Sequence, residues 1–412
     1  MAIKSINDYN YNNKTVLLRV DINSPIHPET KRIQSEDRIK KSIPTIQTLL
    51  DMGAKLVIIA HQGDTLDYSN LIPLEEHAEK LNSYINGNIR YIDDPCGPAA
   101  RKKIEMLKAG EGILLGNLRY LAEEVSTFEN AVKLEPEDME NTYLVRSLLP
   151  LCDYYVNDAF AAAHRNAPSM VAFQRLLPTA AGLLMDKEVK ALNKVMEIPK
   201  APCLFVLGGA KISDAFGMMK QVLETGRADM IITGGITGEI MLMASGYSIG
   251  DEKERFIKDR GLDAFIEDAW KYLNDYPGKI KYPVDLAYES DGKRACLDIS
   301  DLPKSEMFMD IGDKTIALYE AEIAKANTIF VNGPAGVYEN ALFENGTKSI
   351  WKAIASAGGY SVIGGGDTVN AAQKYIDLSN IGYVCTAGGA MVRYLSGKEL
   401  PLIRAMKSAV TE

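Results

Sequence analysis

The sequence predicts an α/β protein with two domains, each built on a parallel sheet with helices on both faces. The chain has 412 residues, which is more than one ordinary hydrophobic core accommodates. Short apolar runs recur along it, and amphipathic segments of helical length separate them. Most of these runs are apolar throughout, as expected of strands that are covered on both faces. The alternation of strands and helices therefore indicates parallel sheets.

The apolar runs place the expected strands at Thr15–Val20, Lys55–Ala60, Gly112–Leu115, Asp153–Val156, Cys203–Leu207, Met230–Thr233, Thr328–Val331, Ser361–Ile363 and Tyr383–Cys385. Helices are predicted at Pro44–Met52 and Asp214–Leu223, with Pro44 in a first turn, where a missing N–H is harmless. A further helix over Met185–Val195 is predicted to connect the two halves.

Composition and charge exclude several classes of protein. The net charge of −9 argues against nucleic-acid binding. No apolar run is long enough to span a membrane, and we expect no signal peptide. The five cysteines are scattered without a CxxC pair, which is typical of free thiols in a reducing cytoplasm. We therefore expect a cytoplasmic protein with small-molecule substrates and neither nucleic-acid nor membrane partners. A monomer is expected, and a dimer remains an alternative.

Glycine-rich turns follow several strands in the second half. The segment Ser361–Thr368 (SVIGGGDT) runs from an apolar strand into three glycines, an acid and a hydroxyl, and similar junctions occur at Leu207–Lys211, Thr233–Ile236 and Asn332–Gly336. Glycine allows close approach of backbone to ligand, and a following helix directs free N–H groups at an anion. Neither GxxxxGK[ST] nor GxGxxG is present. The loops therefore predict a binding site for a phosphorylated nucleotide, and the design of this site differs from both of those motifs.

Three polar side chains in these loops have two interpretations each. Asp367 either holds a metal ion or caps a helix, and Thr368 either caps a helix or donates to a phosphate. Lys211 either reaches a transferring phosphoryl group or is a solvated loop lysine.

Basic and polar side chains follow the predicted strands of the first half, where parallel sheets bind ligands. Arginine presents a planar fork that suits carboxylate and phosphate oxygens. Any one arginine is explained by a structural role, but several together predict an anion site. No role is assigned to His27 or His77. The residues concerned are Arg19, Asp21, Asn23, Arg38 (in a polar segment before a helix), His61, Arg119, Asn157, His164 and Arg165.

Together these segments resemble phosphoglycerate kinase over essentially the whole chain, and their order is that of the family. They are Leu18–Pro25 (LRVDINSP), Asn157–Phe160 with Ala163–Arg165, Gly208–Lys211, Pro283–Asp285, Asp310–Gly312, Asn332–Glu339, Gly364–Thr368 and Gly397–Pro401. The His61-Gln62 pair resembles archaeal members. The resemblance implies two Rossmann-like domains joined by a helix and hinge: a substrate domain (1–180), the helix (181–198), a nucleotide-binding domain (199–392) and a segment returning to the first domain (393–412).

The resemblance also implies the reaction, which is reversible phosphoryl transfer between 1,3-bisphosphoglycerate and Mg-ADP, giving 3-phosphoglycerate and ATP, in line and on hinge closure. Substrate positions of the family match Asp21, Asn23, Arg38, His61, Arg119 and Arg165. Nucleotide positions match Gly208, Gly209, Ala210, Lys211, Gly234, Gly235, Asn332, Pro334, Glu339, Gly364, Gly365, Gly366, Asp367 and Thr368. Arg38, Lys211, Gly365 and Gly366 match the catalytic positions, and Asp367 matches the acid linked to Mg²⁺.

Four positions depart from the family's pattern. Asp64 stands where an arginine is usual, Ala215 where many members have a lysine, Gly116 where a glutamate is usual and Ala387 where a glycine is usual. These departures leave two alternatives open. One is a paralogue that forms an acyl phosphate on a different carboxylate, and the other is a nucleotide-binding protein without catalysis.

Asp64 carries the sharpest of these tests. A carboxylate ~6 Å from a substrate anion, at an effective dielectric constant of ~20, costs about 3 kcal/mol per unit charge. If Asp64 faces the substrate, the Asp64→Arg variant is expected to bind 3-phosphoglycerate more tightly in a titration. Unchanged affinity would show that the side chain does not face the substrate.

Overall fold

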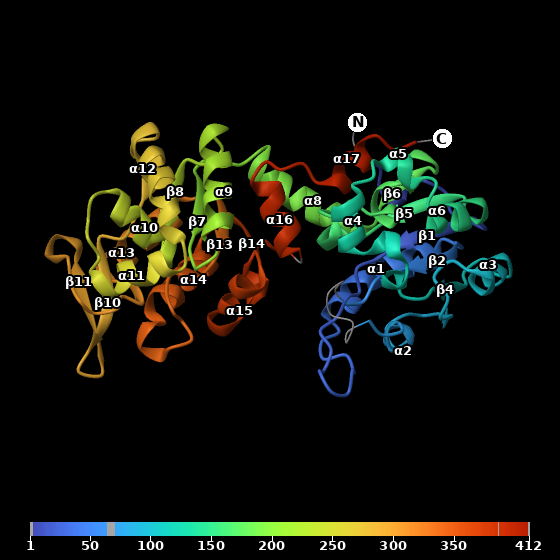
Figure 1. Ribbon diagram of the computed structural model, residues 1–412, viewed down its shortest axis with the longest axis horizontal. Helices are drawn as coiled ribbons and strands as arrows, with labels where there is room; N and C mark the ends of the chain where they lie inside the picture. Colours follow the sequence, from blue (N-terminus) through green and yellow to red (C-terminus); the bar gives the residue numbers. More distant parts are fainter. Residues whose placement is uncertain (1–2, 64–70, 386, 411–412) are drawn as a thin grey trace. The chain divides into compact units, whose positions relative to one another are not determined.

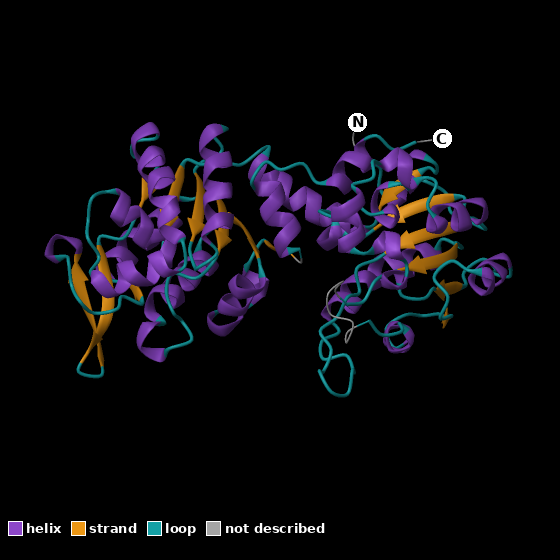
Figure 2. Ribbon diagram, in the orientation of Figure 1, coloured by secondary structure: helices purple, strands orange, loops and turns teal. Residues whose placement is uncertain are grey.

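The computed structural model describes residues 3–63, 71–385 and 387–410. The chain divides into two compact units, Met1–Val189 with Glu399–Glu412, and Lys190–Lys398. Each unit is a parallel sheet between layers of helices (Figures 1 and 2). The predicted fold class, two parallel-sheet α/β domains, is therefore confirmed. None of the described helices is both long enough and apolar enough to cross a membrane. Asp64 lies outside the described residues.

The first unit contains a six-stranded sheet in the order β3-β4-β2-β1-β5-β6, in which every neighbouring pair is parallel. Its strands are β1 (Thr15–Arg19), β2 (Lys55–Ile59), β3 (Ile89–Tyr91), β4 (Gly112–Leu114), β5 (Tyr154–Asn157) and β6 (Thr179–Ala181). Its helices are α1 (Asp37–Asp51), α2 (Glu75–Asn82), α3 (Pro98–Glu105), α4 (Ser126–Val132), α5 (Pro136–Met139), α6 (Tyr143–Leu148), α7 (Pro168–Val171) and α17 (Pro401–Lys407).

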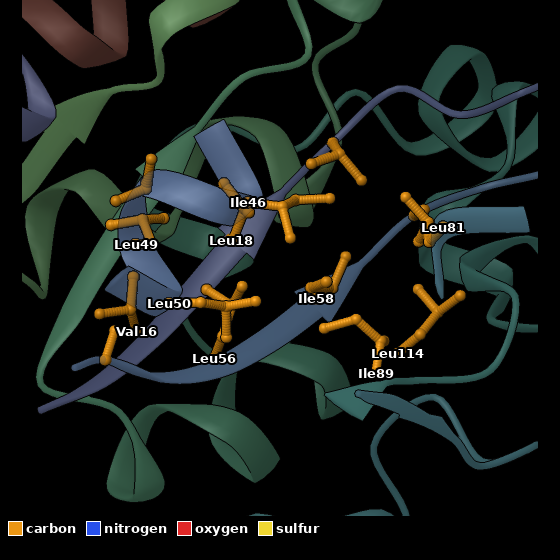
Figure 3. Close-up of a cluster of buried hydrophobic side chains, with 14 of the residues drawn as sticks. Val16, Leu18, Ile46, Leu49, Leu50, Leu56, Ile58, Leu81, Ile89 and Leu114 are labelled. Atoms are coloured by element: carbon orange, nitrogen blue, oxygen red, sulfur yellow. The ribbon is translucent and has the colours of Figure 1, made fainter. Parts of the chain in front are cut away.

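The core of this unit joins helix α1 to the two central strands. Alternate residues of a strand share one face. Leu18 of β1 and Ile58 of β2 thus lie on the face that meets Ile46 and Leu49 of α1 (Figure 3). Burial of each such side chain contributes roughly 1.5–3 kcal/mol. This packing holds the carboxyl ends of β1 and β2, and the first turn of α1, in one region of the unit.

The second unit contains a six-stranded parallel sheet in the order β15-β14-β13-β7-β8-β9 and a separate antiparallel sheet, β11-β10-β12. The parallel strands are β7 (Cys203–Leu207), β8 (Met230–Thr233), β9 (Ile280–Lys281), β13 (Thr328–Asn332), β14 (Tyr360–Gly364) and β15 (Tyr383–Cys385). The antiparallel strands are β10 (Asp285–Ser290), β11 (Lys293–Asp298) and β12 (Asp310–Ile311). Its helices are α9 (Ile212–Glu224), α10 (Gly235–Ala244), α11 (Asp251–Asp259), α12 (Ile266–Asp275), α13 (Asp313–Lys325), α14 (Asn345–Ser356), α15 (Gly366–Tyr375) and α16 (Gly388–Leu395).

The prediction for the first helix is wrong at its start. Helix α1 begins at Asp37, so Pro44 lies inside it and not in its first turn. Proline removes one helical hydrogen bond, but the packing of Ile46 and Leu49 compensates for it. Arg38, predicted in a polar segment before the helix, consequently lies in the first turn of α1.

Helix α8 (Leu183–Met196) begins in the first unit, and the side chain of Asp158 anchors its start. The Oδ1 atom of Asp158 accepts a hydrogen bond from the amide of Met185 at 2.9 Å. Gly182 makes room for this carboxyl group, because a Cβ there would lie 2.3 Å from Oδ1. Asp158 is fully buried, and among the described residues none bonds to its Oδ2. Burial raises the pKa of Asp158 to about 7.

This raised pKa predicts a pH dependence of stability. The folded protein holds the proton of Asp158 more tightly than the unfolded chain does. The contribution of Asp158 to the free energy of unfolding is therefore fully present below about pH 4, and it is lost as the pH rises to about 7. We expect Asp158→Asn to gain stability relative to the parent between pH 5 and pH 8, by on the order of 2 kcal/mol in urea unfolding. The matched control is Asp153→Asn, which replaces an exposed carboxylate. The prediction would be contradicted if the difference in unfolding free energy between variant and parent were independent of pH for both variants.

The C-terminal helix α17 completes the first unit. It packs against α7 and β6, and Figure 1 shows it with the strands and helices of this unit. The amide of Leu402 donates to the carbonyl of Ala163 at 3.2 Å, and the amide of Val410 donates to the carbonyl of Gln174 at 2.9 Å. The sequence of the second unit is thus inserted between two parts of the first.

Candidate active site

The end of β1 and the loop after β2 bring Arg19 and His61 together in the first unit. Arg19 is only 3% exposed, and its Nη2 lies 2.8 Å from Nδ1 of His61. Because a guanidinium only donates, Nδ1 accepts and the ring proton is on Nε2. Burial, followed by the charges of Arg19, Arg119, Arg165 and Arg38, holds the pKa of His61 well below its ordinary value. His61 is therefore a neutral donor among arginines.

Arg38 and Asp21 form the outer edge of this cluster. The Nη1 atom of Arg38 donates to Oδ2 of Asp21 at 2.7 Å, and Oδ1 of Asp21 accepts from the amide of Asn23 at 3.1 Å. The amide of Gly63 donates to Oδ1 of Asn23 at 3.1 Å, which ties the loop after β1 to the loop after β2. A pocket of about 430 Å³ opens here, lined by Asn23, Ser24, Pro25, Ile26, Arg38, Gln62 and Gly63.

Arg119 bonds to the backbone of Glu124 and Arg165 bonds to the side chain of Glu129, two residues that no sequence motif marks. Arg119 donates to the carbonyl oxygens of Gly63 and Glu124. The Nε atom of Arg165 donates to Glu129 Oε2 at 2.6 Å. Within the described part of the chain, nothing accepts a hydrogen bond from the buried Nη2 of Arg165.

The buried carboxylate of Glu124 contacts the cluster of arginines around His61 through Ser169. It accepts hydrogen bonds from the amide and the hydroxyl of Ser169, at 2.7 and 2.6 Å, while the hydroxyl of Ser169 also accepts from Nε of Arg19 at 3.2 Å. Burial raises the pKa of Glu124, and the charges of Arg19 and Arg119 oppose this shift. A lone glutamate in a polar segment resembles a solvated residue, so no sequence signal could have singled out Glu124 or Glu129.

In the second unit, the glycine loops after β7 and β13 interlock through their backbones. The amide of Gly208 donates to the carbonyl of Asn332 at 2.9 Å, and the amide of Gly209 donates to the carbonyl of Pro334 at 2.8 Å. A Cβ on Gly208 would lie 2.3 Å from the carbonyl oxygen of Pro334, and Gly333 has a positive φ of 87°. Only glycine fits such close approach and such a backbone.

The loop after β8 joins the same assembly. The amide of Gly234 donates to the carbonyl of Leu207 at 3.1 Å, and the amide of Gly235 donates to the carbonyl of Ala335 at 2.6 Å. Gly235 is thus both the first residue of α10 and a hydrogen-bond donor to the loop after β13. Three of the predicted glycine loops form one continuous backbone surface.

The fourth loop, after β14, is attached through side chains. The buried amide of Asn332 donates to the carbonyl of Gly364 at 3.1 Å, and Oγ1 of Thr368 accepts from the amide of Gly333 at 2.9 Å. Helix α15 is capped by Gly365, which has a φ of 94°. The interpretation of Asp367 or Thr368 as the helix cap is therefore wrong. Gly366 is the first residue of α15, where N–H groups lack helical acceptors.

Lys211 and Asp367 form an exposed ion pair at the mouth of these loops. Their Nζ and Oδ2 atoms are 2.9 Å apart, and the side chains are 66% and 65% exposed. A pocket of about 40 Å³ lies beside them, lined by Gly208, Gly209, Ala210, Lys211, Asn332, Gly333, Pro334, Gly365, Asp367 and Thr368. Most of the predicted nucleotide residues thus surround one pocket. Glu339 is exposed and is not part of this lining.

Comparisons with known proteins agree over nearly the whole chain. The family described as phosphoglycerate kinase matches residues 6–398. The phosphoglycerate kinase of Methanothermobacter thermautotrophicus is 42% identical over 406 residues, which are 98% of this chain and 97% of the relative. The phosphoglycerate kinase of Thermococcus kodakarensis is 41% identical over 406 residues, 98% of this chain and 96% of the relative.

Solved structures give the same answer. The crystal structure of phosphoglycerate kinase from Pyrococcus horikoshii OT3 has a TM-score of 0.84 and 39% identity, and 98% of each chain is covered. The phosphoglycerate kinase structure from Coxiella burnetii has a TM-score of 0.84 and 30% identity, with 98% of this chain and 99% of that chain covered. The chain therefore belongs to the phosphoglycerate kinase family.

Proposed function

We propose that the first unit binds the phosphorylated glycerate, that the second binds the nucleotide, and that the chain transfers a phosphoryl group reversibly between 1,3-bisphosphoglycerate and Mg-ADP. The observation that carries the proposal is the cluster of Arg19, Arg38, Arg119 and Arg165 around a neutral His61. Such a cluster suits an anion with both carboxylate and phosphate groups. The family to which the chain belongs catalyses this transfer.

The residues of the first unit have distinct roles in this proposal. Arg38 keeps donors free for the substrate because its exposed guanidinium bonds to Asp21 through Nη1. His61 offers the N–H of Nε2 without adding charge, since its Nδ1 faces Arg19. The unused Nη2 of Arg165 supplies a further donor. Together these groups orient the acyl phosphate and neutralise its negative charge.

The residues of the second unit act on the transferring phosphoryl group. The bond from the acyl oxygen to phosphorus breaks as a β-phosphate oxygen of ADP forms the new bond, and the carboxylate of 3-phosphoglycerate leaves. Little covalent work falls to the protein, so catalysis consists of positioning and charge neutralisation. The ammonium of Lys211 provides the charge, and the backbone amides of Gly365 and Gly366 provide fixed donors.

Asp367 fits a role as the protein ligand of Mg²⁺. Its carboxylate is exposed at the nucleotide pocket, and among the described residues no group of three or more His, Cys, Asp or Glu side chains gathers as a metal cage. Mg²⁺ commonly uses one or two carboxylates together with water and substrate phosphates. When bound, the ion neutralises phosphate charge. We further propose that the protein is a monomer in the cytoplasm, where its five free cysteines stay reduced.

The test is a coupled assay of the purified chain with Mg-ATP and 3-phosphoglycerate, run beside a panel of other carboxylates. Turnover of 3-phosphoglycerate well above every other carboxylate is expected. Preference for another carboxylate would overturn the substrate assignment and favour a paralogue. Tight binding of Mg-ADP without turnover of any carboxylate would show that catalysis has been lost.

A further inference from the structure

Gln62 joins the two loops that form the wall of the glycerate pocket. Its side chain is 2% exposed and makes two hydrogen bonds to the backbone of Ser24. The amide of Ser24 donates to Oε1 at 2.8 Å, and Nε2 donates to the carbonyl oxygen of Ser24 at 2.9 Å. These two bonds determine the orientation of the Gln62 amide, with Oε1 as the acceptor. Both Ser24 and Gln62 line the pocket.

His77 also holds the side chain of Gln62. This residue of α2 is fully buried, and its Nε2 lies 3.0 Å from Oε1 of Gln62. Because Oε1 accepts, Nε2 of His77 must carry the proton, and Nδ1 has no partner among the described residues. Burial lowers the pKa of His77 to about 4, so the ring is neutral at pH 7. His77 itself is not part of the pocket lining.

The backbone of Gln62 is fixed as firmly as its side chain. The buried side chain of Asn117 accepts from the amide of Gln62 at 3.0 Å and donates to its carbonyl at 2.9 Å. Next to Gln62, the amide of Gly63 donates to Oδ1 of Asn23. With its backbone held by Asn117, Gln62 transmits a change at His77 to Ser24 through its side-chain amide, which bonds to both residues.

We propose that His77 is a positioning residue for the glycerate pocket, acting through Gln62 on Ser24 and thereby on the loop that carries Asn23. This inference rests on the proposed function, in which the pocket binds 3-phosphoglycerate. Loss of the His77 donor removes one of the hydrogen bonds that hold the Gln62 amide, so the distance between Ser24 and the loop after β2 is less strictly fixed.

The test compares two variants in the coupled assay. His77→Leu removes the donor, whereas His77→Gln keeps an N–H near the position of Nε2. We expect the leucine variant to raise KM for 3-phosphoglycerate about fivefold, as for loss of one buried hydrogen bond, while KM for ATP stays within about twofold. The glutamine variant is expected to recover most of the loss. A thermal melt of each variant reports its folding.

The outcomes separate this inference from the proposed function. No turnover of 3-phosphoglycerate by the unaltered chain would overturn both. Two results would overturn the positioning role alone while the unaltered chain turns over 3-phosphoglycerate normally. One is that His77→Leu and His77→Gln have the same KM for 3-phosphoglycerate. The other is that His77→Leu raises the KM for 3-phosphoglycerate and the KM for ATP equally. If the leucine variant does not fold, ¹⁵N NMR of the unaltered chain decides. We expect the ring signals of His77 to shift on addition of 3-phosphoglycerate and not of Mg-ADP, and unshifted signals would overturn the role.

Discussion

Replacement of Lys211 by alanine is expected to lower kcat about a hundredfold or more and to leave the fold intact. The ammonium group at the mouth of the nucleotide pocket is the cation proposed to neutralise the transferring phosphoryl group, and loss of one such donor typically costs two to three orders of magnitude. The side chain is 66% exposed, so its removal opens no cavity, and an exposed pair with Asp367 contributes less than about 1 kcal/mol to stability. Steady-state kinetics with Mg-ATP and 3-phosphoglycerate measure the effect.

Lys220 provides the matched control for this experiment. It lies on α9 and forms an exposed ion pair with Glu224 at 3.9 Å. Lys220→Ala removes the same charge from the same part of the unit without touching the pocket, and near-normal kcat is expected. Turnover of Lys211→Ala at the level of this control would refute the role given to Lys211.

Replacement of Arg38 by alanine is expected to lower kcat/KM for 3-phosphoglycerate at least a hundredfold. The substitution removes a guanidinium from the pocket and also leaves the buried carboxylate of Asp21 without its counter-charge. Both changes repel an anion. Arg38→Lys is expected to recover part of the affinity, because lysine restores the charge but not the planar fork.

A second arginine in the same unit tests whether the effect of Arg38 is local. Arg32 is 68% exposed and pairs with Glu76 at 3.4 Å, and it is not part of the pocket lining. Arg32→Ala changes the net charge equally and is expected to keep kcat/KM within about twofold. Comparable losses in the two variants, measured at the same ionic strength, would point to the overall field of the unit and not to a specific contact.

The central strands could be predicted because their apolar runs are uninterrupted, and each predicted strand is found to within one residue at either end. Edge strands lack this signal. β3 carries the exposed Arg90, and β9 has only two residues, so neither gives an apolar run. The antiparallel sheet of the second unit was also missed, because β11 is mostly polar and stays partly exposed.

The candidate site likewise has one group of residues that the sequence predicts and another that it does not. The glycine loops could be predicted because a missing side chain is a local requirement, seen where Gly208 approaches the carbonyl oxygen of Pro334. The supporting residues could not be predicted because their partners come from other elements. Glu129 reaches Arg165 across 36 positions, and Gln62 reaches Ser24 across 38. For the same reason, no pattern in the sequence indicates a role for His77. The roles of the candidate site residues in binding and catalysis stay predictions.

The insertion of the second unit between residues 189 and 399 has a consequence for synthesis on the ribosome. The inserted unit emerges as one unbroken stretch and can fold as soon as it has left the exit tunnel. The first unit begins earlier but lacks Leu402 of α17 and Val410, whose hydrogen bonds to Ala163 and Gln174 form only after residue 410 has been synthesised. The second unit can therefore be completed before the first, and a nascent chain that stalls between residues 398 and 402 carries a complete second unit and an incomplete first unit.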